Sequence, residues 1–273
     1  MRTTIILILV VTLAAGCRSA SSHSGKRTVA ASFYPLAFAA EQVGGPTVEV
    51  ENLTPPGVEP HDLEVSPKTL ARIREADLVL LLGRDFQPQL EDAAGHGRRV
   101  LRLLDTPGLD LHSNDDPHVW LDPLRYAIIV RRIGEALHEP GRAAALTKRL
   151  RGLEREYRRG LAHCQRHEIV TSHEAFAYLS ERYGLRQVAI TGLSPEAEPA
   201  PRKLQQVIES VRKTGTTTIF FETLVSPRIA DTVARETGAR TAVLDPIDVA
   251  KNGDYFTIMD RNHDALREAL GCR

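Results

Sequence analysis

Aromatic side chains are scarce in this sequence, and neither sign of charge is in excess. Tryptophan, tyrosine and phenylalanine make up 5% of the 273 residues, and 35 acidic residues balance 35 lysines and arginines. Pockets for organic ligands are lined mainly by apolar and aromatic side chains, so the composition disfavours a receptor for a siderophore or a cobalamin. The zero net charge gives no overall field that would attract nucleic acid.

Long apolar runs are also missing. The mainly apolar run at residues 5–15 is far shorter than the roughly 20 residues that span a bilayer. It follows the basic Arg2 and precedes small residues, which predicts a signal peptide over residues 1–16. The segment LAAGC is similar to a bacterial lipobox, which implies lipidation of Cys17; an ordinary secretory signal with an incidental cysteine is the alternative. Residues 17–27 would then form a flexible tether on the outer face of the cell membrane.

Cysteine is rare, and only Cys164 and Cys272 remain after Cys17. In an exported protein, an even remainder of cysteines suggests a disulfide. We therefore predict a bridge between Cys164 and Cys272, with two separate free thiols as the alternative.

From Thr28 onward the chain alternates strand-like with helix-like segments, which predicts parallel sheets. Strands are expected at residues 28–32, 48–53, 77–82, 99–104, 168–172, 187–191, 217–222 and 241–244. Helices are expected at residues 36–43, 66–76, 123–138, 142–163, 174–183, 201–214, 226–237 and 255–270.

The helix predicted at residues 142–163 is long, densely charged and apolar on one side only. It could be a rigid spacer between two halves, or an ordinary covering helix on one large domain. We predict an α/β fold of two lobes, each with a small, mostly parallel, four-stranded sheet flanked by helices. The N-terminal lobe would span residues 28–139, the long rigid linking helix residues 140–165, and the C-terminal lobe residues 166–273.

Four candidate ligands lie at or after the carboxyl ends of predicted strands or in ordered loops, two in each lobe: His61, His118, His173 and Asp245. Ligands of open parallel sheets bind beyond the carboxyl ends of the strands. Three imidazoles and a carboxylate suit a borderline divalent cation, with zinc as the first choice. Taken singly, each histidine is as well explained by a supporting role beside a ligand, or by a surface position, as by a ligand role. Asp245 alone could cap a turn before Pro246.

Two further acids are candidates near this site. Glu222 ends the strand-like segment TTIFFE and could accept a hydrogen bond from a ligand imidazole or add a carboxylate to the metal. Glu59, close to His61, is a weaker candidate of the same kind. We expect the other seven histidines to be solvated: His23, His96, His112, His138, His163, His167 and His263.

The segment DPHVWLDP places His118 and the single tryptophan between two Asp-Pro pairs. Asp122 can cap a helix whose first turn accepts Pro123. His118 should therefore lie on a short ordered segment, with Trp120 packed beneath it.

Together, the motifs PHDLEVSP, ADLVLLLG, DPHVWLDP, TSHEAFAYLSERYGL and VLDPI resemble the ZnuA/TroA-like (cluster A-I) metal-binding lipoproteins of ABC transporters. The resemblance runs from about Thr28 to the C-terminus. It implies two α/β lobes with a metal between them, held by His61, His118, His173 and Asp245. Manganese-binding relatives typically have Glu at the third position, so His173 favours zinc. The His- and acid-rich loop of many zinc members is shortened here to LDLHSNDD.

The function implied is that of an exported zinc receptor that hands its ion to a membrane permease driven by a cytoplasmic ATPase. We expect a monomer without enzymatic activity, and a role in adhesion is neither supported nor excluded. A manganese- or iron-binding member of the same family is the first alternative. A zinc-dependent hydrolase is less favoured: Glu174 or Glu222 could act as base, but no HExxH motif is present.

Overall fold

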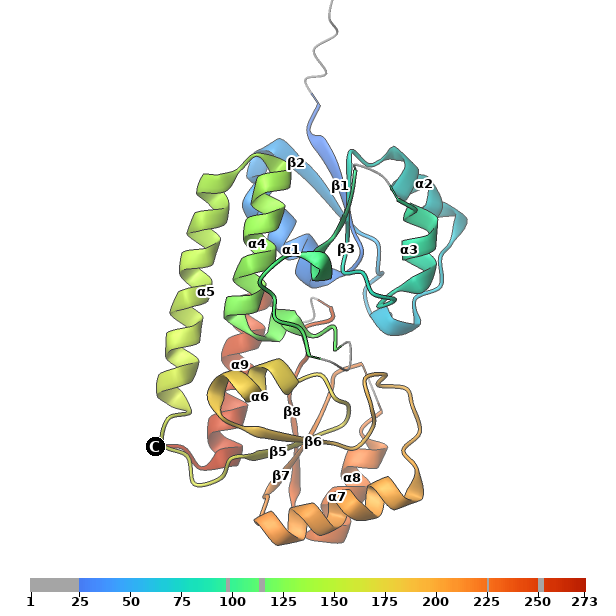
Figure 1. The fold of residues 1–273 in the computed structure, drawn as a ribbon. Coiled ribbons are helices and arrows are strands. Elements are labelled where there is room, and N and C mark those ends of the chain that lie inside the picture. The colour runs from blue at the N-terminus through green and yellow to red at the C-terminus, as the bar shows by residue number, and fades with distance from the viewer. Residues whose placement is uncertain (1–24, 97–98, 113–115, 225, 250–252) are drawn as a thin grey trace, which may run out of the picture.

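Two parallel four-stranded sheets organise the chain, one above the other in Figure 1. The computed structural model describes residues 25–96, 99–112, 116–224, 226–249 and 253–273. The predicted signal peptide, Cys17 and most of the predicted tether lie outside these residues. Within the described ranges, no helix has the length and apolar character needed to cross a membrane.

The N-terminal sheet has the strand order β2-β1-β3-β4, and every pair is parallel. All four residues of β3 are buried because helices cover both faces of the sheet, which explains its uninterrupted apolar sequence. The strands are β1 (Arg27–Ala31), β2 (Val48–Asn52), β3 (Leu78–Leu81) and β4 (Val100–Arg102). The helices are α1 (Tyr34–Gly44), α2 (Pro67–Glu75) and α3 (Pro88–Ala94).

The C-terminal sheet repeats this arrangement in the order β6-β5-β7-β8, again with parallel pairs. Gly184 and Gly215 end α6 and α7 in the left-handed conformation, with φ values of 68° and 66°. The strands are β5 (Glu168–Thr171), β6 (Arg186–Ala189), β7 (Thr218–Phe221) and β8 (Arg240–Val243). The helices are α6 (Ala177–Tyr183), α7 (Pro201–Thr214), α8 (Arg228–Thr237) and α9 (Tyr255–Leu270).

Two helices run side by side along one edge of the molecule, from the first sheet to the second (Figure 1). They are α4 (Pro123–Leu137) and the 21-residue α5 (Pro140–Gly160). The predicted cap is confirmed, because an Asp122 carboxylate oxygen accepts a hydrogen bond from the backbone N–H of Leu124 at 2.9 Å. One cluster of buried side chains extends from Val29 in β1 to Leu244 after β8. The lobes therefore share a core in addition to the linking helix.

The two-lobed parallel fold is confirmed, while the lobe boundaries at residues 139 and 165 stay predictions. Three helices differ from expectation by three residues or more, and one of them, α5, ends at Gly160 instead of residue 163. The short α3 was not predicted, because its seven residues are too few to show helical periodicity. The helix expected from residue 174 begins only at Ala177. The carbonyl of His173 accepts hydrogen bonds from the Thr171 hydroxyl and the Gln187 amide, so it is not used to start a helix.

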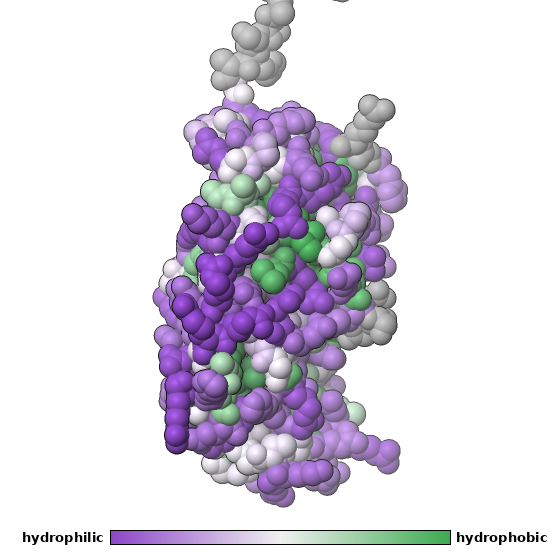
Figure 2. Space-filling view, turned by 60° about the vertical axis from the view of Figure 1, so that its left-hand side comes forward, coloured by the Kyte–Doolittle hydropathy of each residue, from purple (hydrophilic) through white to green (hydrophobic). Residues whose placement is uncertain are grey.

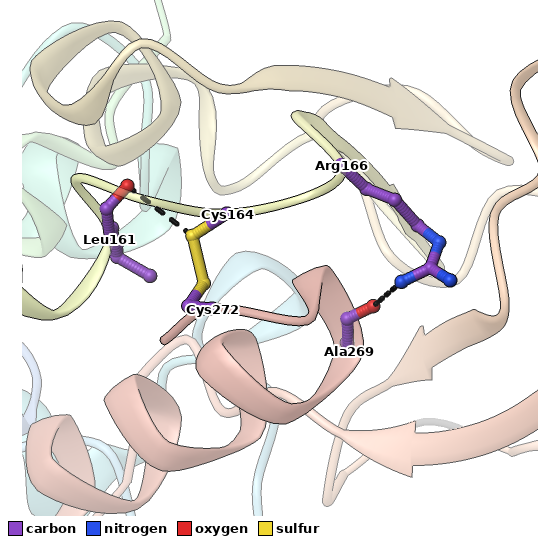
Figure 3. Close-up of a disulfide and its surroundings, with 5 residues drawn as sticks. All are labelled: Leu161, Cys164, Arg166, Ala269 and Cys272. Atoms are coloured by element: carbon purple, nitrogen blue, oxygen red, sulfur yellow. Dashed lines mark hydrogen bonds between the residues drawn. A yellow bond between two sulfur atoms is a disulfide. The ribbon is translucent and has the colours of Figure 1, made fainter.

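A disulfide joins Cys164, beyond the end of α5, to Cys272, beyond the end of α9 (Figure 3). Arg166 reaches across the same junction and donates a hydrogen bond to the carbonyl of Ala269. The bridge ties the chain at the start of the second lobe to its end, across a sequence separation of 108 residues.

Replacing both cysteines with serine is expected to lower the free energy of unfolding by about 4–5 kcal/mol, because the unfolded chain regains the entropy of a long open loop. Urea denaturation of the double variant and of the unmodified protein measures the difference. Treating the unmodified protein with a reductant should give the same loss. Equal stability with and without the reductant would contradict the prediction.

Candidate metal centre

His61 lies on a single 3-10 turn, Pro60–Asp62, in the loop that follows β2. The carboxylate of Glu59 caps this turn by accepting a hydrogen bond from the His61 backbone N–H at 3.3 Å. The imidazole packs edge-on against Phe86, with 4.7 Å between ring centroids. Its Nε2 is buried and has no hydrogen-bond partner among the described residues. The turn therefore leaves a buried ring nitrogen of His61 without a partner in the described part of the chain.

His118 is fully buried, directly before the 3-10 turn Val119–Leu121 that leads into α4. Its Nδ1 lies 2.7 Å from a carboxylate oxygen of Asp116, which also accepts from the His118 backbone N–H at 3.0 Å. Tyr178 of α6 donates its hydroxyl proton to the carbonyl of Asp116 at 2.9 Å. A carboxylate on Nδ1 holds the proton there and leaves the Nε2 lone pair available to a cation.

Trp120 fixes this segment against both lobes. Its ring lies beneath His118, with 5.2 Å between centroids, and packs edge-on against Phe33. Its indole N–H donates a hydrogen bond to the carbonyl of Pro246 in the second lobe at 2.7 Å. Tyr255 of α9 donates to the carbonyl of Trp120 at the same distance. The direction of His118 is therefore set by packing and by hydrogen bonds from two elements far apart in sequence.

His173 follows β5 and is also fully buried. Its Nδ1 lies 2.6 Å from a carboxylate oxygen of Glu222, which follows β7. The same oxygen accepts a hydrogen bond from the hydroxyl of Ser172. Because β7 lies beside β5 in the sheet, the ends of these two strands bring the acid and the imidazole together. Glu222 also accepts a hydrogen bond from the His173 backbone N–H at 3.3 Å, as Asp116 does from that of His118, but its contact with the His173 Nδ1 is a close approach without hydrogen-bond geometry.

The three imidazoles converge. One nitrogen from each of His61, His118 and His173 lies within 4.8 Å of the others, and the Nε2 atoms of His118 and His173 are 3.3 Å apart. Two nitrogens bound tetrahedrally to one zinc ion at about 2.0–2.1 Å lie about 3.3–3.4 Å from each other. If the two carboxylates keep the protons on Nδ1, two lone pairs face each other at this distance. Such a pair is repulsive alone and is stabilised by a cation between them.

Burial favours the neutral form of two of the imidazoles, those of His61 and His118. It lowers the pKa of His61 to about 2, with a further contribution from the neighbouring His118 and His173. Burial also lowers the pKa of His118, against the opposing effect of the hydrogen bond to Asp116. Conversely, burial raises the pKa of Glu59 to about 7. Neutral imidazole is the form that binds a metal ion, so the site is ready to coordinate without first losing protons from these two rings.

Asp245 follows β8 at the same edge of the sheet but is not part of the group of converging atoms. Neighbouring strands are about 4.8 Å apart, and β8 is two strands from β5, so the strand ends alone leave Asp245 about 10 Å from His173. Asn262 of α9 holds its backbone with two hydrogen bonds, of 2.9 and 2.6 Å. One carboxylate oxygen caps the turn through the N–H of Ile247 at 2.7 Å. A ligand role for Asp245 therefore stays a prediction.

Three residues near the site were missed or misread in the sequence. Asp116 was not singled out, although an acid two residues before a histidine can fold back onto its ring. No sequence pattern marked Asp248 as a residue of the site. Its side chain is nevertheless 2% exposed and lines a tight pocket with Glu222 and Asp245. His112 is not simply solvated, because it stacks on Tyr178 at 4.0 Å and lies 3.8 Å from Asp116.

Changing Asp116 to asparagine is expected to weaken zinc binding by about 10–100-fold, because the group that orients a ligand imidazole is nearly as important as the ligand. A competition titration against a zinc chelator measures the loss. Asp110→Asn changes an exposed acid in the same segment and should leave the affinity unchanged. Equal affinities for the two variants would show that Asp116 does not orient His118.

The family described as zinc-uptake complex component A, periplasmic (ZnuA), matches residues 29–269. The zinc-binding lipoprotein AdcA of Streptococcus pneumoniae is 33% identical over 287 residues, covering 92% of this chain and 57% of AdcA. This chain thus spans little more than half the length of AdcA. The high-affinity zinc uptake system protein ZnuA of Bacillus subtilis is 32% identical over 288 residues, covering 92% of this chain and 90% of that protein.

Solved structures agree with the sequence relatives. The laminin-binding protein Lmb of Streptococcus agalactiae, described as a bifunctional protein with adhesin and metal-transporting activity, superposes with a TM-score of 0.84 at 30% identity, covering 89% of this chain and 99% of Lmb. The Zn(II)-bound ZnuA-like domain of S. pneumoniae AdcA gives 0.75 at 33% identity, covering 90% and 99%. These matches confirm the resemblance noted in the motifs, and this chain belongs to the ZnuA family of zinc-uptake components.

Proposed function

We propose that this chain is an extracytoplasmic receptor that captures Zn²⁺ and delivers it to the permease of an ABC importer. The observation that carries the proposal is the 3.3 Å separation of the His118 and His173 Nε2 atoms, which is the spacing of two ligands on one tetrahedral zinc ion. Membership of the ZnuA family supports the same cargo. Nitrogen ligands favour zinc over manganese, which is better suited by carboxylates and water.

The ligand set we propose is His61, His118, His173 and Asp245. Four protein ligands leave no open position for a reacting water, so we propose binding without turnover. Glu222, the base considered for a hydrolase, contacts His173 and accepts from Ser172, which supports a positioning role instead. Release of the ion would need small movements of loops around a shared core rather than wide opening of the lobes, because the hydrogen bond from Trp120 to Pro246 joins them beside the site.

The proposed cellular location and partners of the protein follow from its predicted signal peptide and from the proposed receptor function. We propose that the chain is exported, lipidated on Cys17 and tethered to the outer face of the cell membrane as a monomer. There it would meet a permease coupled to a cytoplasmic ATPase.

A titration of the metal-stripped protein with chelator-buffered zinc and manganese tests the cargo. Trp120 is the only tryptophan and lies against His118, so its fluorescence reports binding. We expect one tight zinc per chain and much weaker manganese. Tighter manganese binding would assign the protein to the manganese-binding members of the family, and the absence of any tight metal would refute the site.

Asp245→Ala is expected to weaken zinc binding while the stoichiometry stays at one per chain, because three imidazoles still hold the ion. Isothermal titration gives both quantities in one experiment. An unchanged affinity would remove Asp245 from the ligand set and leave it the turn-capping role that its hydrogen bond to Ile247 describes.

A further inference from the structure

A groove with apolar and cationic lining residues lies between α4 and α5, and none of the metal-centre histidines lines it. It encloses about 570 Å³, and Pro140, Ala143 and Ala144 contribute to its lining. The hydroxyl of Thr147, in the same groove, is buried and has no hydrogen-bond partner among the described residues. The groove therefore offers a shallow apolar surface with one polar atom in it.

Four cations line this groove: Arg131 on α4, with Lys148, Arg151 and Arg155 on α5. Within the described part of the chain, none of the four takes part in an ion pair or a side-chain hydrogen bond. Glu135, the one acid in the lining, already pairs with Arg132 at 3.0 Å. The lining is therefore positive and uncompensated.

The charge of α5 departs from that of the chain as a whole. Its 21 residues hold seven lysines and arginines against two glutamates, whereas the whole chain has zero formal net charge. Figure 2 brings the α4–α5 side of the molecule forward, where hydrophilic side chains dominate and hydrophobic patches lie between them. A positively charged face with apolar side chains between its cations is complementary in charge and in polarity to an anionic, amphipathic surface.

The position of β1, where the proposed tether enters the fold, indicates which anionic surface this face would meet. β1 enters the fold at the same end of the molecule as the turn between α4 and α5 (Figure 1). Residues 18–26, between the proposed lipid anchor and β1, can extend roughly 30 Å, at about 3.3–3.6 Å per residue. The 21-residue α5 has a similar length at about 1.5 Å per residue. The tether can therefore lay this face on the membrane that holds it.

We propose that the α4–α5 groove docks on the anionic phospholipid headgroups of that membrane. The inference depends on the proposed lipid anchoring for its biological setting, but not on zinc binding. Docking would restrict the orientation of the receptor, with α4 and α5 turned toward the lipid.

Flotation with large unilamellar vesicles tests the proposal. The chain without residues 1–17 is used, because the lipid anchor would itself cause binding and because every described element lies outside the deleted segment. We expect binding to phosphatidylcholine vesicles containing phosphatidylglycerol, none to pure phosphatidylcholine, and release at high salt. The variant Arg131→Gln, Lys148→Gln, Arg151→Gln, Arg155→Gln should bind more weakly by about fivefold for each cation removed.

A matched control removes the same charge elsewhere, from exposed positions on α7 and α8: Arg202→Gln, Lys203→Gln, Lys213→Gln, Arg228→Gln. It should bind anionic vesicles as the unmodified chain does. An equal loss in both variants would reduce the effect to net charge and overturn the assignment to the groove. Failure of the unmodified chain to bind anionic vesicles would overturn the proposal outright, and a normal zinc affinity in the same samples would show that the proposed function is unaffected.

Discussion

Replacing His118 with alanine is expected to weaken zinc binding by roughly a thousandfold, because loss of a ligand must exceed the 10–100-fold loss caused by removing its support. The imidazole is fully buried beside His61 and His173, and its Nε2 lies 3.3 Å from that of His173. Alanine leaves a cavity that no neighbouring nitrogen fills. Equilibrium competition with a chelator of known affinity measures the change.

His96→Ala is the matched control, because His96 is an exposed histidine of the first lobe away from the converging group. It should bind zinc as the unmodified chain does. Thermal melting without metal should show that both variants are folded. A folded His118→Ala protein that retains tight zinc binding would refute the assignment of the centre.

Asp122→Ala is expected to lower the free energy of unfolding by about 3–5 kcal/mol, because a buried charge network loses its central acid. The Asp122 carboxylate is fully buried and lies 2.8 Å from Arg125 and 2.7 Å from Arg182. Arg125 belongs to α4 and Arg182 to α6, so the acid joins the linking region to the second lobe. Without it, two guanidinium groups remain partly buried with fewer partners. Urea denaturation measures the change.

Asp254→Ala is the control that separates the effect of losing a helix cap from the effect of losing the buried ion pairs of Asp122. Asp254 caps α9 by accepting from the N–H of Thr257 at 2.9 Å, as Asp122 caps α4, but it is more exposed and makes no ion pair among the described residues. Its loss should cost only about 1 kcal/mol. If Asp122→Ala cost no more than Asp254→Ala, the buried ion pairs would contribute nothing beyond the cap.

The regular elements were predictable because each depends on local chemistry. The apolar run before Gly83 reads as a buried strand, and α7 and α9 have their predicted limits because a proline, a capping aspartate and two glycines mark their ends. The element that was missed, α3, is too short to show a period. The late start of α6 could not be read locally, because the His173 carbonyl is bound by Gln187 of another strand.

For the site, the sequence indicated which residues lie at the ends of strands and in ordered loops. Three of the four proposed ligands are histidines whose ring atoms the structure brings together. The pairing of Glu222 with His173 was one of two roles considered for that acid, and the order of the strands selected it. Asp245 lies outside the group because β8 is one strand further from β5 than β7 is.

The sequence by itself determined the fold class, the order of the elements and the chemical type of the site, because periodicity, capping residues and imidazole side chains act locally. Only the tertiary structure decided how the imidazoles are directed. Asp116 lies 2.7 Å from the Nδ1 of His118, and Glu222 lies 2.6 Å from that of His173. Tyr178 of the second lobe donates to the carbonyl of Asp116, and Trp120, beside His118, donates to that of Pro246 in the second lobe. These contacts depend on packing between segments far apart in the chain, and the spacing of residues along the sequence does not contain that information.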